Sequence, residues 1–139
     1  MSTTLTDQDQ ELIAAATDLI KQHYMPGKHK VAAAIRLDTG EIITSLNLEG
    51  SFGCIDTCAE QNALAAVFSA GKHNVQSIVA VKHPKPLAED QTIKVVSPCG
   101  RCRELLCDYA PNATVLIPDG STVSKRTALE LLPFRYSKL

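Results

Sequence analysis

The chain has no excess charge of either sign. Its 139 residues include 14 lysines and arginines against 15 aspartates and glutamates, which gives a formal net charge of -1. Proteins that hold a polynucleotide through its phosphates need a basic field on their surface. The overall composition supplies no such field, so we expect no polynucleotide substrate.

The sequence also lacks a long apolar run. No segment approaches the ~18 apolar residues that span a bilayer. The first seven residues do not combine a basic region with an apolar stretch, as a signal peptide does. We therefore expect a cytoplasmic protein with no membrane partner.

Repeats, linkers and low-complexity segments are absent as well. Hydrophobic residues make up 45% of the chain and charged residues 21%, as in an ordinary globular protein. A chain of this length fits one domain built around one core. We expect residues 1–139 to form a single domain.

Helical and extended patterns alternate along the chain. Thr6 is a suitable N-cap for a helix, and Asp38-Thr39-Gly40 is a suitable hairpin turn. The pattern predicts helices over 7–23, 58–71, 97–109 and 127–132, and strands over 31–37, 41–48, 77–81 and 113–117, with a short extended segment at 93–96. This order is typical of an α/β fold in which helices cover a mixed sheet.

Two short motifs carry the chemistry. Thr57-Cys58-Ala59-Glu60 is followed by Pro98-Cys99-Gly100-Arg101-Cys102, and three of the five cysteines of the chain lie in these motifs. Cys99 and Cys102 are three residues apart, so a helix presents both on one face. Three thiolates leave one position of a tetrahedral Zn²⁺ open, which distinguishes a catalytic zinc from a structural one.

Glu60 and Arg103 are the expected helpers of this zinc. All three cysteines fall at predicted first turns of helices, where the helix dipole lowers a thiol pKa. Glu60 is placed to move a proton to and from a zinc-bound water. Arg103, four residues after Cys99, is a candidate donor to a zinc-bound sulfur.

Two alternatives remain open from the residues alone. A structural zinc in a non-catalytic binding module needs a fourth ligand, and Cys54, Cys107 or a histidine is available for that role. A redox pair at Cys99 and Cys102 leaves Cys58 and Glu60 without an explanation. Cys54 and Cys107 also fit as plain packing residues.

The two motifs together resemble those of the zinc nucleoside and nucleobase deaminases, which share a cysteine, a glutamate two residues later and a downstream Pro-Cys-x-x-Cys. The three-cysteine pattern resembles the small cytidine deaminases, including the blasticidin-S deaminase branch. The resemblance implies a three-layer α/β/α fold with a mixed five-stranded sheet, assembled as a homotetramer. It also implies one zinc per subunit on Cys58, Cys99 and Cys102, with Glu60 as proton shuttle.

The same resemblance implies hydrolytic deamination of the cytosine ring in free nucleosides such as cytidine or deoxycytidine. The alternative substrate is the nucleoside antibiotic blasticidin S. The expected substrate contacts are the following: Asn47 and Glu49 at the sugar hydroxyls, with Ala59, Phe52 and His29 lining the pocket. His29 stands where the family usually has a phenylalanine, and Gln61 where it often has an arginine. Phe134 and Tyr136 either cover a site or form a docked tail.

Overall fold

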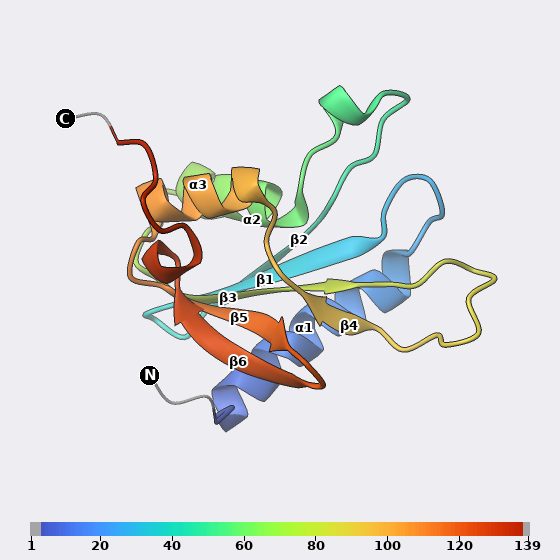
Figure 1. Ribbon diagram of the computed structural model, residues 1–139, viewed down its shortest axis with the longest axis horizontal. Helices are drawn as coiled ribbons and strands as arrows, with labels where there is room; N and C mark the ends of the chain where they lie inside the picture. The colour runs from blue at the N-terminus through green and yellow to red at the C-terminus, as the bar shows by residue number, and fades with distance from the viewer. Residues whose placement is uncertain (1–3, 138–139) are drawn as a thin grey trace.

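The computed structural model describes residues 4–137, so residues 1–3 and 138–139 of the expected single domain lie outside the described part. The elements in chain order are α1 (Asp7–His23), β1 (Val31–Leu37), β2 (Ile42–Leu46), the 3₁₀ turn η1 (Gly53–Ile55), α2 (Ala59–Ser69), β3 (Val75–Lys82), β4 (Lys94–Val96), α3 (Gly100–Tyr109), β5 (Thr114–Asp119), β6 (Thr122–Thr127) and the 3₁₀ turn η2 (Leu129–Leu131). Figure 1 shows α2 and α3 on one face of the sheet and α1 on the other. The expected three-layer α/β/α architecture is confirmed.

The sheet is mixed and has the order β2-β1-β3-β5-β6. β1 pairs antiparallel with both β2 and β3, whereas β3 and β5 run parallel. β4 forms a sixth strand outside this path and pairs antiparallel with β3. The five-stranded path therefore matches the expected sheet, with one short strand added.

The central strands are buried on both faces, and alternate residues face different helices. Ala33 and Ile35 of β1 join the core beneath α2 and α3, whereas Ala32 and Ala34 join the core that contacts α1. This two-residue period follows from the pleat of a strand. Small alanines on both faces of β1 let the helical layers approach the sheet closely.

The first helix has the bounds that the sequence predicts. Thr6 caps it, since the Thr6 side chain accepts a hydrogen bond from the Asp9 backbone N–H at 3.1 Å and the Asp9 carboxylate accepts one from the Thr6 N–H at 2.9 Å. Such a reciprocal capping box satisfies two of the free N–H groups at a helix start. Asp9 also pairs with Lys125 of β6, which ties the helix to the edge of the sheet.

The C-terminal part differs from the prediction of a strand followed by a helix over 127–132. Residues Thr122–Thr127 form an edge strand paired along its length with β5, and only Leu129–Leu131 are helical, as a single 3₁₀ turn. An edge strand with one solvent-facing side tolerates polar residues such as Lys125 and Arg126, so its pattern is not distinctly apolar. The Asp119-Gly120 turn, where Gly120 has φ +62°, is the hairpin signal for this strand.

Two strands share one side of β3 and then diverge. β5 pairs with β3 at Ser77 and Ile78, whereas β4 pairs with β3 further along, at residues 80–82. Only three residues separate the end of β4 from the start of α3, so the position of β4 beside β3 fixes where α3 starts on the face of the sheet that α2 also covers (Figure 1). The start of α3 thereby comes next to the start of α2, as the ribbon shows (Figure 1).

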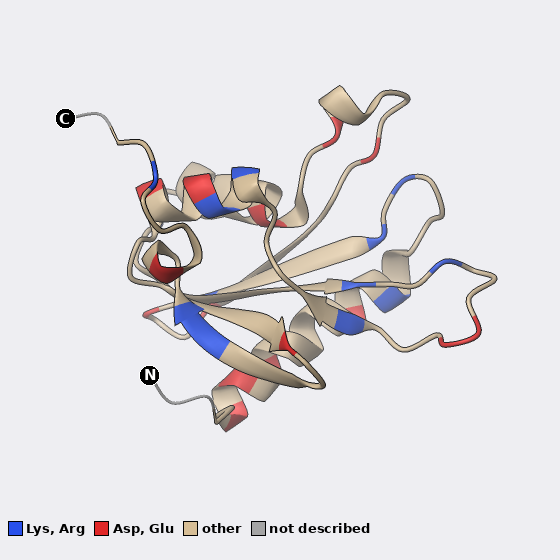
Figure 2. Cartoon of the chain, viewed as in Figure 1, with Lys and Arg blue, Asp and Glu red and all other residues tan. Residues whose placement is uncertain are grey.

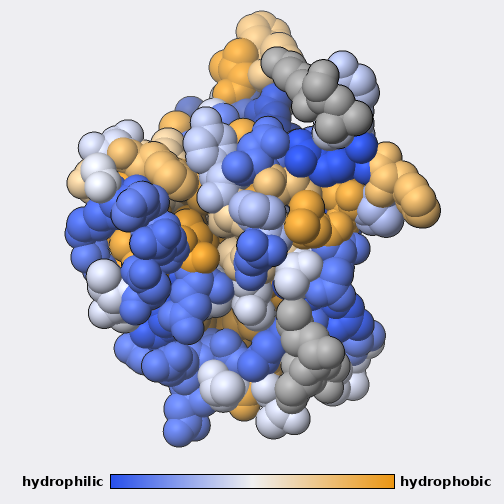
Figure 3. Space-filling model, turned by 90° about the vertical axis from the view of Figure 1, so that its left-hand side faces the viewer, coloured by the Kyte–Doolittle hydropathy of each residue, from blue (hydrophilic) through white to orange (hydrophobic). Residues whose placement is uncertain are grey.

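The surface that carries the chain ends is largely hydrophilic, with hydrophobic residues in separate patches (Figure 3). Phe134 and Tyr136 are almost fully exposed, at 104% and 82%, so neither forms a docked tail on this chain. Within residues 4–137, no helix has the length and apolar character needed to cross a membrane.

Candidate active site

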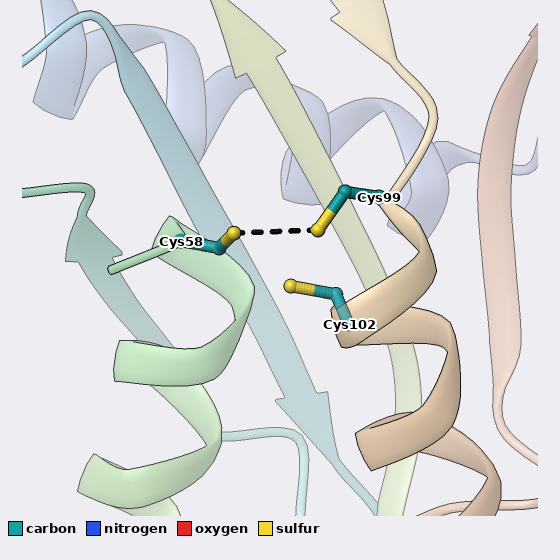
Figure 4. Close-up of side chains that lie close together, drawn as sticks. All are labelled: Cys58, Cys99 and Cys102. Carbon is teal, nitrogen blue, oxygen red and sulfur yellow. Dashed lines mark hydrogen bonds between the residues drawn. The ribbon is translucent and has the colours of Figure 1, made fainter. Parts of the chain in front are cut away.

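The starts of α2 and α3 bring three cysteine side chains together. Cys58 is the N-cap of α2, Cys99 is the N-cap of α3, and Cys102 lies in the first turn of α3. The Cys58 side chain makes no capping bond to its own helix, so its sulfur remains available. Figure 4 shows the three sulfurs pointing toward one another from the two helices.

The spacing of these sulfurs fits one zinc ion. The three Sγ atoms lie within 4.8 Å of one another, and Cys58 Sγ is 3.4 Å from Cys99 Sγ. Sulfur ligands at ~2.3 Å from a tetrahedral zinc are ~3.8 Å apart, which is within this range. Thiolate ligands also match the preference of zinc for nitrogen and sulfur donors. The donor set and its geometry therefore fit the metal that the sequence predicts.

The pKa values of the three thiols depend on burial, hydrogen bonds and nearby charges as well as on their positions at helix N-termini. For Cys99, burial is outweighed by hydrogen bonds from the backbone N–H of Cys102 and from the Cys58 thiol, so the Cys99 pKa is lowered, as expected at a helix N-terminus. Burial raises the pKa of Cys58 and of Cys102, and the nearby Glu60 carboxylate adds to both rises. The expected lowering thus holds for one thiol, and zinc must displace protons from the other two.

Glu60 lies beside the three sulfurs and is 6% exposed. The Cys102 thiol donates to Glu60 Oε2 at 3.7 Å. Burial raises the pKa of the Glu60 carboxyl above its usual value. A carboxyl with a raised pKa exchanges protons more readily near neutral pH, as a general acid–base group requires.

The fourth position of the zinc site has no protein ligand in the described part of the chain. The cluster of metal-binding side chains contains Cys58, Cys99 and Cys102 and no other histidine, cysteine, aspartate or glutamate. Cys107 is buried and donates to the Ala128 carbonyl at 3.4 Å, and Cys54 is exposed in η1. The closed structural site that needs one of these residues is therefore not formed, and an open catalytic site remains.

A cavity of about 230 Å³ opens directly onto this centre. Its lining comes from the starts of β1, α2 and α3, the end of β4 and the loop before α2: Lys30, Val31, Asn47, Glu49, Asp56, Thr57, Cys58, Ala59, Glu60, Val96, Ser97 and Cys99. Ligand pockets usually measure about 300–1,000 Å³, so this cavity suits one small ring more than a large molecule. Two of the thiols and the Glu60 carboxylate therefore lie on the wall of one small pocket.

Asn47 and Glu49, the predicted sugar contacts, both line the cavity. The Asn47 side-chain oxygen accepts hydrogen bonds from the backbone N–H of Lys30 at 2.8 Å and of Val31 at 3.0 Å. The Glu49 carboxylate forms an ion pair with Lys30 Nζ at 2.7 Å. Both side chains therefore hold the start of β1 against the pocket, and the amide N–H₂ of Asn47 is the part that is left for a ligand.

Ala59 lines the cavity as expected, but His29 and Phe52 do not. His29 shares a hydrogen bond of 2.9 Å between its Nδ1 and the Asn47 carbonyl, and it lines a separate hollow beside α1 and β2. Phe52 is 70% exposed just before η1. Neither side chain lines the zinc cavity of its own chain, so the prediction that His29 and Phe52 enclose the substrate is not met within one chain.

Arg103 differs from its expected role. Its Nε donates to the Pro98 carbonyl at 2.9 Å and its Nη1 to the Leu131 carbonyl at 3.1 Å. The guanidinium therefore fixes the segment before Cys99 and joins it to η2, instead of donating to a sulfur.

Two residues at the site were not predicted from the sequence. Asn62 donates to the Leu46 carbonyl at 2.8 Å and to Thr57 Oγ1 at 3.0 Å, which fastens the first turn of α2 to the end of β2. Ser97, at the start of the predicted helix over 97–109, lines the cavity, and the helix itself begins after Cys99. The spacing of Asn62, four residues after Cys58, is the only signal in the sequence for its role.

The fold and the site define a zinc-dependent hydrolase with an open metal position. Comparison with known proteins agrees: residues 6–117 match the model described as the cytidine and deoxycytidylate deaminase zinc-binding region. The chain is 44% identical over 134 residues to a blasticidin-S deaminase of Bacillus cereus, with 96% of each chain covered. It is 29% identical over 127 residues to a cytidine deaminase of Halalkalibacterium halodurans, which covers 89% of this chain and 90% of that one.

Solved structures agree with the sequence relatives. A cytidine deaminase from Bacillus anthracis superimposes with a TM-score of 0.77 at 28% identity, covering 91% of this chain and 88% of that one. One from Burkholderia pseudomallei gives a TM-score of 0.75 at 26% identity, covering 95% and 100%. The chain belongs to the cytidine and deoxycytidylate deaminase family. It is a zinc-dependent deaminase, and the resemblance noted in its sequence is confirmed.

Proposed function

We propose that this enzyme hydrolyses the C4 amino group of the cytosine ring in a free nucleoside such as cytidine or deoxycytidine and releases ammonia. The observation that carries the proposal is the open three-cysteine centre with buried Glu60 on the wall of a cavity of ring size. We further propose that it works in the cytoplasm, where a reducing environment keeps zinc-binding thiols reduced.

Zinc, when bound, supplies the Lewis acid that makes water nucleophilic near neutral pH. Glu60 would take one proton from the attacking water and pass it to ring N3; it would then take the remaining proton from the hydroxyl added at C4 and pass it to the leaving amine, so that C4 becomes a carbonyl and ammonia leaves. Its burial keeps bulk water from competing for these protons. The N–H₂ of Asn47 donates to a sugar hydroxyl, since its oxygen is already used by the start of β1.

A substrate panel tests this proposal. Zinc-loaded protein is incubated separately with cytidine, deoxycytidine and blasticidin S, while the loss of aminopyrimidine absorbance is followed. We expect turnover of cytidine and deoxycytidine. The 44% identity to a blasticidin-S deaminase supports the second candidate, and turnover of blasticidin S alone would establish that function instead.

We also propose that the enzyme assembles as a homotetramer. A groove of about 430 Å³ lies between α2 and α3, where the rings of Phe68 and Tyr109 pack at a tilt of 55° with centroids 5.1 Å apart and remain partly exposed. Gln61, which also lines this groove, has a buried Oε1 without a hydrogen-bond partner in residues 4–137. The loop before α2 exposes Phe52 and Ile55 as a second apolar surface. Two separate surfaces are what a closed assembly of four copies needs.

Light scattering after size-exclusion chromatography tests the assembly. We expect the mass of four chains for the native protein and a smaller species for Phe68→Asp, because a charge in the α2–α3 groove disfavours its burial. Leu87→Asp is the matched control, since Leu87 is 97% exposed on a loop remote from these helices. A single-chain mass for the native protein would contradict the proposal.

A further inference from the structure

A second, larger hollow adjoins the zinc cavity. It measures about 670 Å³, and Lys30 and Glu49 line both spaces. Its other walls are the turn after α1, the end of β3 and the loop after β3, and they include Tyr24, Lys82, His83 and Lys85. The part of a substrate that extends from a ring in the small cavity therefore has this hollow as its neighbour, across the Lys30–Glu49 ion pair.

The hollow has a net positive charge. Lys30, Lys82 and Lys85 line it, against Glu49 as the one acidic lining residue. Glu49 is already paired with Lys30 at 2.7 Å, so it is not free to attract a cationic group. Within residues 4–137, the ammonium groups of Lys82 and Lys85 have neither an ion-pair nor a hydrogen-bond partner. Figure 2 shows several Lys and Arg positions near the end of the sheet where β1 begins and β3 ends.

The strand register adds an independent sign of this charge. Lys82 of β3 lies directly opposite Lys94 of β4, and like charges at such positions repel each other. Lys94 is compensated by Asp90 at 3.2 Å, but Lys82 is not. On its other side Lys82 lies opposite Val31, which lines the zinc cavity. The unpaired ammonium group of Lys82 therefore belongs to the strand next to the one that lines the zinc cavity.

The wall behind these lysines is rigid. Tyr24 and His83 stack with ring centroids 3.7 Å apart and planes 9° from parallel. The His83 backbone N–H donates to the Lys30 carbonyl at 2.7 Å, which joins the loop after β3 to the start of β1. A fixed wall beside unpaired cations is suited to a defined anionic group, because little has to be reordered on binding.

Resting on the function proposed above, we propose that this second hollow binds an acidic group on the part of the substrate that extends beyond the cytosine ring, and that Lys82 and Lys85 recognise it. A phosphate and a carboxylate share the required chemistry. The group lies past Lys30 and Glu49 from the zinc centre. The proposed site is confined to one hollow, so it is consistent with a chain whose net charge of -1 does not favour a polynucleotide substrate.

Steady-state kinetics with three matched substrates test the inference. Cytidine, cytidine 5′-monophosphate and the 5′-carboxylate of cytidine share the ring and differ in the acidic group. We expect kcat/KM for at least one acidic substrate to exceed that for cytidine by about tenfold or more, because charge-assisted hydrogen bonds are the strong ones. We expect this preference to weaken with added salt, which screens exposed charges. Whichever acid is preferred identifies the source of the group.

The variant Lys82→Gln/Lys85→Gln should lower the ratio of acidic to neutral kcat/KM by about tenfold or more. Lys72→Gln is the control, because Lys72 pairs with Glu41 far from the site and carries the same charge. Equal values of kcat/KM for all three substrates, or a preference that survives in the double variant, would overturn the inference while cytidine turnover upholds the proposed function.

Binding separates the two proposals further. Calorimetric titration with uridine and uridine 5′-monophosphate needs no turnover, so it reports on the hollow even if no cytosine compound is deaminated. Tighter binding of the monophosphate that disappears in the double variant supports a phosphate-binding hollow independently of the reaction. Equal affinity of the two ligands for the native protein, together with no preference for the carboxylate in the kinetics, contradicts it.

Discussion

Glu60→Gln should bind zinc normally and lose turnover by about 10³-fold or more. General acid–base groups contribute about 10²–10⁴-fold, and Glu60 serves more than one proton transfer in the proposed reaction. Glutamine has nearly the same shape but does not accept and return a proton. Metal content by elemental analysis and ammonia release by a coupled assay measure the two properties on one preparation.

Glu104→Gln is the matched control for this change. Glu104 lies on α3 and pairs with Arg135 at the surface, outside the zinc cavity. We expect its zinc content and turnover to equal those of the native enzyme. Native turnover by Glu60→Gln would remove the proposed role of this carboxylate, and loss of zinc in the same variant would reassign Glu60 to metal binding.

Cys102→Ala should lose zinc, activity and stability together. Cys102 is fully buried, and its sulfur lies close to those of Cys58 and Cys99. Among residues 4–137, no solvent-exposed side chain is therefore placed to replace Cys102 as a zinc ligand. A ligand present at ~1,000 times its Kd contributes about 4 kcal/mol to stability. For a chain of this size, losing that contribution lowers Tm by about 10 °C or more. Elemental analysis and thermal unfolding in the presence of zinc measure the loss.

Cys107→Ala and Cys54→Ala are the controls, because each removes a cysteine that is not a proposed zinc ligand. Cys107 is buried but lies apart from the three sulfurs, and Cys54 is exposed. Both variants should retain one zinc per chain, although Cys107→Ala should unfold somewhat earlier because it leaves a small void. Full zinc occupancy in Cys102→Ala, or zinc loss in either control, would contradict the assignment of ligands.

The parts predicted best from the sequence are those fixed by local chemistry. The helix at 7–23 has a capping residue, an acidic first turn and a regular apolar stripe, and its bounds agree with the structure. The ligands Cys58, Cys99 and Cys102 are similarly local, because each takes its position from a helix start. The three sulfurs come together because α2 and α3 cover the same face of the sheet with their N-termini side by side (Figure 1).

The parts that the sequence did not predict depend on contacts between distant segments. The strand at 122–127 is stabilised by pairing with β5 and by the ion pair of Lys125 with Asp9, neither of which leaves an apolar pattern. His29 is turned by its bond to the Asn47 carbonyl, and Arg103 by two carbonyls on separate segments. Side-chain direction in such loops is set by tertiary structure, so spacing along the chain does not reveal it.

The most direct test of the catalytic centre is ammonia release before and after zinc removal. Native protein, protein stripped of metal by a chelator and the same protein reloaded with one equivalent of zinc are each given cytidine, deoxycytidine and blasticidin S. We predict one ammonia per uracil-ring product in the native and reloaded samples and none in the stripped sample. Fully zinc-loaded protein that releases no ammonia from any of the three compounds, or stripped protein that remains active, would contradict the account.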